Sequence, residues 1–174
     1  MTEMSEERKA AFRLEVLATV VRAELVAAGL PVMPEDDPPG TAGALVRVDR
    51  PDMRGVLVDW QSHSVLMDAA LEAWAEDPLQ EGEETAAFKR LNDGIGEAMQ
   101  EAMRKIMTTA GLEVVDTDND YAPHELLVTR LLTKSPWQQR RSAAHERRGD
   151  RMRAAWNQRH EDERRKQQDS DGQA

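Results

Sequence analysis

The sequence of 174 residues contains no cysteine, and only 4% of its residues are aromatic. Without cysteine the chain has no disulfide bonds, thiolate zinc sites, iron–sulfur clusters or cysteine nucleophiles. It also has no run of about 20 apolar residues, which a transmembrane helix needs. Residues 1–7 are acidic, whereas a signal peptide begins with basic residues. We therefore expect a cytoplasmic protein.

Charge is unevenly distributed along the chain. Residues 1–133 carry 12 basic and 26 acidic side chains, a net charge of −14, whereas residues 134–168 carry 11 basic and 5 acidic ones, a net charge of +6. The length suits one domain and a tail. The sequence therefore predicts an acidic domain over 1–133, a basic Arg-rich helical arm over 134–168 and a disordered tail over 169–174. The excess of Arg over Lys is typical of a GC-rich bacterial genome.

The first half of the acidic domain shows one helical and one strand-like pattern. Apolar residues at three- and four-residue steps predict a helix from Ser5, its expected cap, to Gly29. Residues 34–40 combine prolines with adjacent carboxylates and predict an exposed loop. Residues 44–60 contain two segments of period-two alternation around Pro51, which predicts a β-hairpin.

The second half is mostly helical in pattern. We expect a helix capped by Ser62 or Ser64 and running to about Trp74, and a long helix over 83–110 with an apolar stripe. The β-branched segment 112–116 predicts a third strand. Segment 122–132 is ambiguous, because Pro123 and the Leu127/Leu131 spacing favour a helix whereas Val128-Thr129 suits a strand; we predict a helix.

These elements define the expected fold class as α+β and mostly helical. A small antiparallel sheet, made from the hairpin 44–60 and a possible strand 112–116, is expected to be covered by helices on one face. The basic C-terminal helical arm follows it.

The acidic turn Asp116–Asp120 is the strongest metal candidate. Its carboxylates alternate, as oxygen ligands for a divalent ion do, and His124 follows. The sixth and twelfth positions of a calcium loop should be Gly and Glu, but they are Tyr121 and Leu127 here. The sequence therefore predicts a solvated turn and no metal ligands, with a metal-assisted enzyme as a less favoured alternative.

Catalytic motifs are missing. The four histidines, His63, His124, His145 and His160, form no metal-binding spacing, and no serine lies in a nucleophile motif. Gly40 and Gly43 lack the Lys-Ser/Thr ending of a phosphate-binding loop. We therefore predict no catalytic residues, no cofactor and no enzymatic activity.

The long helix 83–110 offers a possible surface for self-association. Met99, Met103 and Met107 lie at four-residue steps, and methionine suits both irregular cores and adaptable binding grooves. Small residues at 94, 98 and 102 form a neighbouring line that would let another backbone approach. Core packing is the favoured interpretation, and a homo-oligomer formed through this helix remains open.

The arm is the feature that most clearly predicts a partner. Ser135-Pro136 is typical of a helix start, and the segment that follows has no adequate apolar stripe. The candidate residues for binding a partner or a nucleic acid are the arm's tryptophans and six of its arginines: Trp137, Arg140, Arg141, Arg147, Arg148, Arg151, Arg153 and Trp156.

These observations favour a small non-catalytic interaction or regulatory accessory protein. It would bind a protein partner, or its own acidic domain, through the long helix or the basic arm. The alternative is a nucleic-acid-associated accessory protein, because arginines contact phosphates and tryptophan stacks on bases. The acidic domain opposes the approach of phosphate, so a protein partner is favoured.

Overall fold

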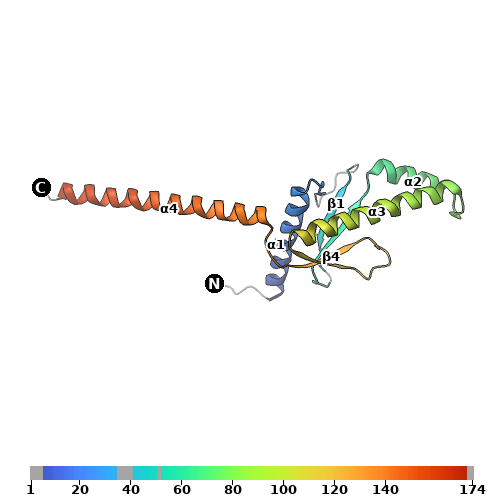
Figure 1. Cartoon of the computed structure of the whole chain (residues 1–174), viewed down its shortest axis with the longest axis horizontal. Coiled ribbons are helices and arrows are strands. Elements are labelled where there is room, and N and C mark those ends of the chain that lie inside the picture. The colour runs from blue at the N-terminus through green and yellow to red at the C-terminus, as the bar shows by residue number, and fades with distance from the viewer. Residues whose placement is uncertain (1–5, 35–40, 51, 172–174) are drawn as a thin grey trace. The chain divides into compact units, whose positions relative to one another are not determined.

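The described residues form four helices and four strands, which follow one another along the chain (Figure 1). The computed structural model describes residues 6–34, 41–50 and 52–171, with side chains through Arg164. Its elements are α1 (Glu6–Ala27), β1 (Gly43–Val48), β2 (Val56–Gln61), α2 (Ser64–Glu76), α3 (Glu83–Thr109), β3 (Leu112–Asp116), β4 (Leu126–Leu131) and α4 (Pro136–Asp171). The α+β, mostly helical fold class is confirmed. The chain divides into two compact units, residues 1–133 and 134–174.

The strands form one antiparallel sheet in the order β1-β2-β4-β3. β1 and β2 form the predicted hairpin, with Val46 opposite Val58. β3 is the predicted third strand. The long connection from β2 through α2 and α3 returns the chain to the sheet, where β4 inserts between β2 and β3.

One face of the sheet carries the hydrophobic core. Alternate strand residues point toward α1 and α3, which pack together on this face. Met103 and Met107 of α3 are completely buried there, beside Leu25 of α1. The favoured core interpretation of these two methionines agrees with their burial. The central core residues are Leu17, Ala18, Val21, Leu25, Ala44, Val46, Val56, Val58, Met103, Met107, Leu112, Leu126 and Val128.

A short segment before β1 lies along the outer edge of that strand. Val32 forms a parallel bridge with Ala44, and Ala44 N–H donates to the carbonyl of Pro31 at 2.8 Å. A Cβ at Gly43 would lie only 2.9 Å from that carbonyl oxygen, so glycine permits this close approach. The edge of β1 is thereby partly covered by the chain itself.

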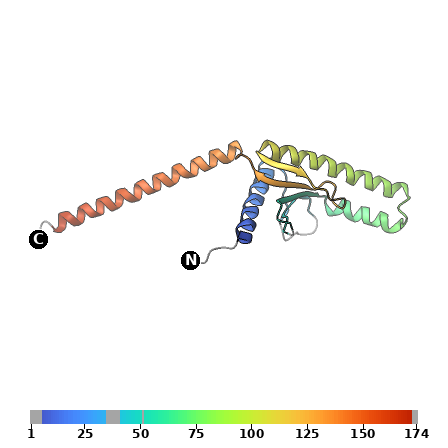
Figure 2. The same ribbon diagram turned by 90° about the horizontal axis from the view of Figure 1, so that it is seen from below.

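α2 and α3 lie side by side as an antiparallel pair (Figures 1 and 2). The carboxylate of Asp77, after α2, accepts a hydrogen bond from Gly82 N–H at 2.7 Å, just before α3 begins. This bond fixes the turn between the two helices. α3 ends before Gly111, whose φ of 92° is readily adopted only by glycine.

The helix predicted over 122–132 is wrong, because residues Leu126–Leu131 form β4. Val128 pairs with Val114, but Arg130 pairs with Glu113, which leaves Thr129 as an extra residue in β4. This β-bulge places Val128 and Leu131, three residues apart, both toward the core. The resulting spacing imitates the periodicity of a helix.

Two smaller expectations also need correction. His63, and neither Ser62 nor Ser64, caps α2: its Nδ1 accepts a hydrogen bond from Val65 N–H at 3.1 Å. α4 continues to Asp171, inside the segment predicted to be a disordered tail, and residues 172–174 lie outside the described residues. The predicted cap Ser5 and most of the predicted loop 34–40 also lie outside them.

Candidate functional site

α4 starts as the sequence predicts. Pro136 is its first residue, where the missing proline N–H costs no helical hydrogen bond. Gln139 closes the first turn, since its N–H donates to Ser135 O at 3.0 Å and its side-chain amide donates to Lys134 O at 2.7 Å. No residue of α4 from Pro136 to Arg164 is buried. Most of these residues are exposed to solvent, and the others are half-buried.

The candidate residues on α4 fall on different sides of the helix. At about 100° per residue, Trp137, Arg141 and Arg148 share one side. The structure brings these three together along one concave surface, which His145 also lines. Trp137 is 37% exposed. This surface, defined by Trp137, Arg141, His145 and Arg148, is called the arginine face below.

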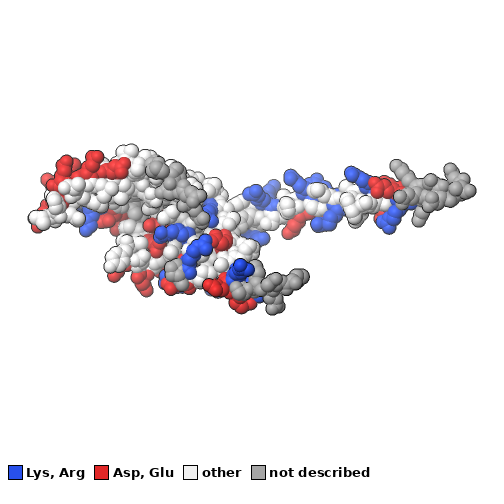
Figure 3. Space-filling model, turned by 180° about the vertical axis from the view of Figure 1, so that it is seen from behind, with Lys and Arg blue, Asp and Glu red and all other residues white. Residues whose placement is uncertain are grey.

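The remaining candidate arginines of α4 do not form a single site with the arginine face. Arg153 projects from the opposite side and pairs with Asp150 at 2.5 Å. Arg151 Nε donates to the carbonyl of Arg147 at 3.3 Å. Arg140 and Arg147 are exposed and flank the face. Figure 3 shows basic side chains along α4 with acidic ones between them.

Trp156 belongs to a separate local cluster. Its ring meets that of His160 edge to face, with centroids 3.9 Å apart, and His160 Nδ1 lies 3.2 Å from a Glu163 carboxylate oxygen. Trp137 and Trp156 are 19 residues apart, which separates them by roughly 28 Å along a helix axis. The two tryptophans therefore cannot stack on one small ligand.

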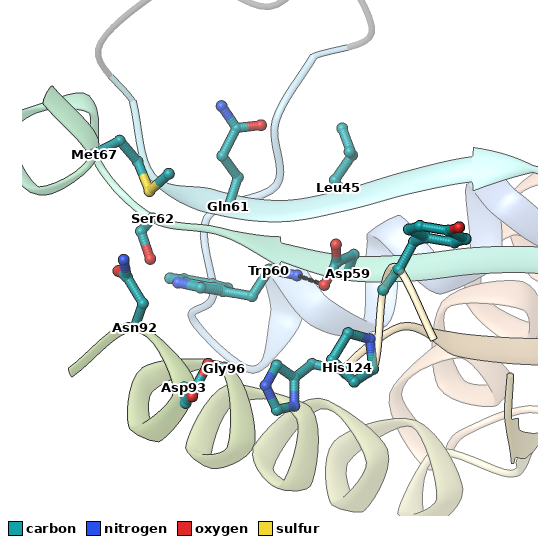
Figure 4. Close-up of a pocket in the computed structure, with 13 residues that line it drawn as sticks. Leu45, Asp59, Trp60, Gln61, Ser62, Met67, Asn92, Asp93, Gly96 and His124 are labelled. Atoms are coloured by element: carbon teal, nitrogen blue, oxygen red, sulfur yellow. Dashed lines mark hydrogen bonds between the residues drawn. The ribbon is translucent and has the colours of Figure 1, made fainter. Parts of the chain in front are cut away.

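A second candidate site lies in the first unit and was missed by sequence reasoning. A cavity of about 450 Å³ opens where β2 ends. Its walls come from β2, from the start of α2, from the middle of α3 and from the β3–β4 loop. Figure 4 shows Trp60 extending from β2 toward α3, with Ser62, Asn92, Asp93 and His124 around it.

The glycine at position 96 allows His124 to lie against α3. A Cβ at Gly96 would be only 2.4 Å from His124 Cδ2 and 2.9 Å from Nε2. By contrast, a Cβ at Gly94 would meet nothing within 4 Å. The neighbouring loop is also held to α3, because the Gln100 amide donates to Pro123 O at 3.5 Å. The only sequence signal for this cavity was a tryptophan ending a strand.

Several shifted pKa values mark contacts that stabilise the fold. The pKa of Asp77 is lowered, first by the hydrogen bond from Gly82 N–H and then by Thr85. The pKa of Glu113 is lowered by the hydrogen bonds from Arg130 and Thr129, beside the β-bulge. Hydrogen bonding to Asp49 raises the pKa of Arg54. These groups support a turn, a bulge and a hairpin.

Two polar side chains of the acidic turn after β3 have partners within the protein. Asp116 pairs with Arg104, and Asn119 Oδ1 accepts a hydrogen bond from Tyr121 N–H at 3.1 Å. Within the described part of the chain, no three Asp, Glu or His side chains are grouped so that they could hold one metal ion. The metal-assisted alternative gains no support from this geometry.

The chain matches no protein-family model, and no match to it was found among curated proteins or solved structures. Among the described residues, no helix is both long enough and apolar enough to cross a lipid bilayer.

Proposed function

We propose that this chain is a non-catalytic interaction protein of the cytoplasm whose helix α4 docks into an acidic groove of a partner protein. The observation that carries this proposal is the complete lack of buried residues from Pro136 to Arg164 in a helix of 36 residues. A helix in water gains most of its stability by packing one face against other groups. α4 therefore offers surface for a partner, since none of its residues from Pro136 to Arg164 is fully buried.

The composition of the arginine face suits a protein partner. Trp and Arg are the residues most often found at the energetic centres of protein interfaces. Exposed ion pairs contribute only ~0–1 kcal/mol each, so docking would need Trp137 as an apolar anchor in addition to the arginines. α3 is a weaker candidate, because its Met103 and Met107 already fill the core.

The experiment uses the full chain with two double substitutions of equal charge. Arg141→Glu with Arg148→Glu reverses the arginine face, whereas Arg153→Glu with Arg164→Glu reverses the opposite side of α4. A partner recovered from nuclease-treated host lysate is purified, and its binding to each variant is measured by calorimetry. We expect an acidic partner and at least about tenfold weaker binding for the first variant alone.

Equal binding by the two variants would contradict docking through the arginine face. A separate gel-shift assay at low salt tests nucleic acid: if the unsubstituted chain shifts DNA or RNA and the first variant does not, the nucleic-acid alternative is favoured. Docking of α4 on the chain's own acidic domain would instead appear as changed NMR signals in residues 1–133 after truncation at Ser135.

A further inference from the structure

The cavity at the end of β2 has the chemistry of a cation site. We propose that it binds an organic cation, namely a guanidinium or primary ammonium group. Its volume of about 450 Å³ is large enough for a long basic side chain or a small amine. The proposal depends on three features of the lining: an unpaired acceptor, a group of aromatic rings and a surplus of acidic groups.

The unpaired acceptor is Asn92 Oδ1. This atom is buried, and among the described residues it has no hydrogen-bond partner. A buried carbonyl oxygen without a donor costs free energy, and such atoms are uncommon in folded proteins. Asn92 lines the cavity, so a small rotation of its amide would bring Oδ1 to a donor on a ligand there. Guanidinium and ammonium groups carry several donors and no acceptor.

The aromatic rings come from Trp60 on β2 and His124 in the β3–β4 loop (Figure 4), and Tyr121 of the same loop also lines the cavity. Trp60 and His124 are half-buried, whereas Tyr121 is exposed. A cation over the face of an indole ring is attracted by the ring's electrons, and a planar guanidinium also stacks on it. Gly96 contributes to the site because any larger residue there would displace His124.

The charged groups of the lining favour the same ligand class. Asp59 and Asp93 line the cavity, and Asp93 is exposed at its mouth. One oxygen of the Asp59 carboxylate accepts a hydrogen bond from the backbone N–H of Trp60 at 2.8 Å. Neither Lys nor Arg occurs among the described residues of the lining. The cavity therefore attracts cations and repels phosphates and carboxylates.

A matched pair of ligands tests the charge requirement. The two ligands are Nα-acetylarginine amide and Nα-acetylcitrulline amide, called arginine amide and citrulline amide below. They have nearly the same shape, but only arginine amide carries a positive charge, because the urea group of citrulline amide is neutral and acetylation removes the α-ammonium group from both. Each is titrated into the full chain while NMR follows the Trp60 indole N–H and the His124 ring signals. We expect arginine amide to shift both signals and to bind at least about tenfold more tightly than citrulline amide. Equal binding, or no shift of either signal, would overturn the proposal.

Substitutions locate the site independently. Asp93→Asn should weaken arginine amide binding about tenfold, whereas the control Asp68→Asn, an equal change in charge on α2, should leave it within about twofold. Gly96→Ala should weaken binding, and Gly94→Ala should not. An unchanged affinity in both Asp93→Asn and Gly96→Ala would place the ligand elsewhere. The two-ligand comparison stays valid even where a variant fails to fold.

The cation can be a free amine or a side chain carried by a protein. A peptide corresponding to residues 135–164, which carries the arginines of α4, distinguishes these sources. If the peptide shifts the Trp60 and His124 signals and competes with arginine amide, the site accepts side chains of a protein such as a second copy of this chain. Shifts caused by arginine amide alone would identify a free cation as the ligand.

Discussion

Arg47 and Glu125 form an ion pair that joins β1 to the start of β4, with Arg47 Nη2 2.6 Å from Glu125 Oε1. The carboxylate side chain is 4% exposed and the guanidinium side chain is 51% exposed. The two residues are distant in sequence, and Glu125 also holds the β3–β4 loop, because its carbonyl accepts a hydrogen bond from Thr117 at 3.2 Å. Arg47 thus compensates for the burial of a negative charge beside the sheet.

Replacing Arg47 should therefore destabilise the protein clearly. Arg47→Met leaves the Glu125 carboxylate buried without its cation, and we expect the free energy of unfolding to fall by about 2 kcal/mol. The control is Arg50→Met, since Arg50 pairs with Glu15 at 2.9 Å in an exposed pair; it should cost less than ~1 kcal/mol. Urea denaturation measures both. Similar losses would show that the burial of Glu125 is unimportant.

The glycines at 94 and 96 should respond in opposite ways to the same substitution. Gly94→Ala adds a methyl group in open space on a helix and should stabilise the protein by ~0.5–1 kcal/mol. Gly96→Ala should lose this gain, because the new methyl group meets the ring of His124. Thermal unfolding of the two variants gives the comparison. Equal stabilisation would mean that the His124 ring moves away at no cost.

Acid should weaken the turn between α2 and α3. The pKa of Asp77 lies below its ordinary value of 3.8 because Gly82 N–H donates to the charged carboxylate. A lowered pKa in the folded state stabilises the protein above the ordinary pKa, and this contribution is lost as pH falls through the folded value. Asp77→Asn should therefore flatten the fall in melting temperature between about pH 5 and about pH 2. Asp68→Asn, at an exposed position on α2, should retain the wild-type profile.

Met103 should be far more sensitive to truncation than a methionine of α4. Met103 is 0% exposed and lies in the core, whereas Met152 is 68% exposed. Met103→Ala should cost ~2–5 kcal/mol through lost burial and the cavity left behind. Met152→Ala should change the stability of the first unit very little. Chemical denaturation followed by Trp fluorescence checks both, and a small loss at Met103 would contradict its place in the core.

Sequence patterns predicted most of the fold because local signals and packing agree there. The hairpin has clean alternation, and α3 has a long apolar stripe that ends at Gly111. β4 was missed because Pro123 and the Leu127/Leu131 spacing suit a helix, and because the bulge at Thr129 interrupts the regular alternation of a strand. Its position between β2 and β3 depends on hydrogen bonds with strands that are distant in sequence, and local periodicity carries no information about such pairing.

The two candidate sites also differ in how far the sequence could predict them. The arginine face follows from residue types along one helix, so sequence identified Trp137, Arg141 and Arg148. It could not show that Arg153 pairs with Asp150 or that Trp156 contacts His160. The cavity unites Trp60, Asn92 and His124 from three separate elements. No local sequence pattern connects such residues. From the sequence alone, His124 is only a possible ligand or catalytic group beside the acidic turn.

The covered edge of β1 also affects how the protein resists aggregation. A sheet polymerises through strand edges that offer free backbone groups to another chain. The bridge from Val32 occupies part of one edge, and the strand at the other edge, β3, is short and carries Glu113 and Asp116. Because Arg130 lowers the pKa of Glu113, that side chain keeps its negative charge in more acidic solution. Two copies brought together edge to edge along β3 would therefore have to bury charged groups, even when ordinary glutamates have begun to lose their charge.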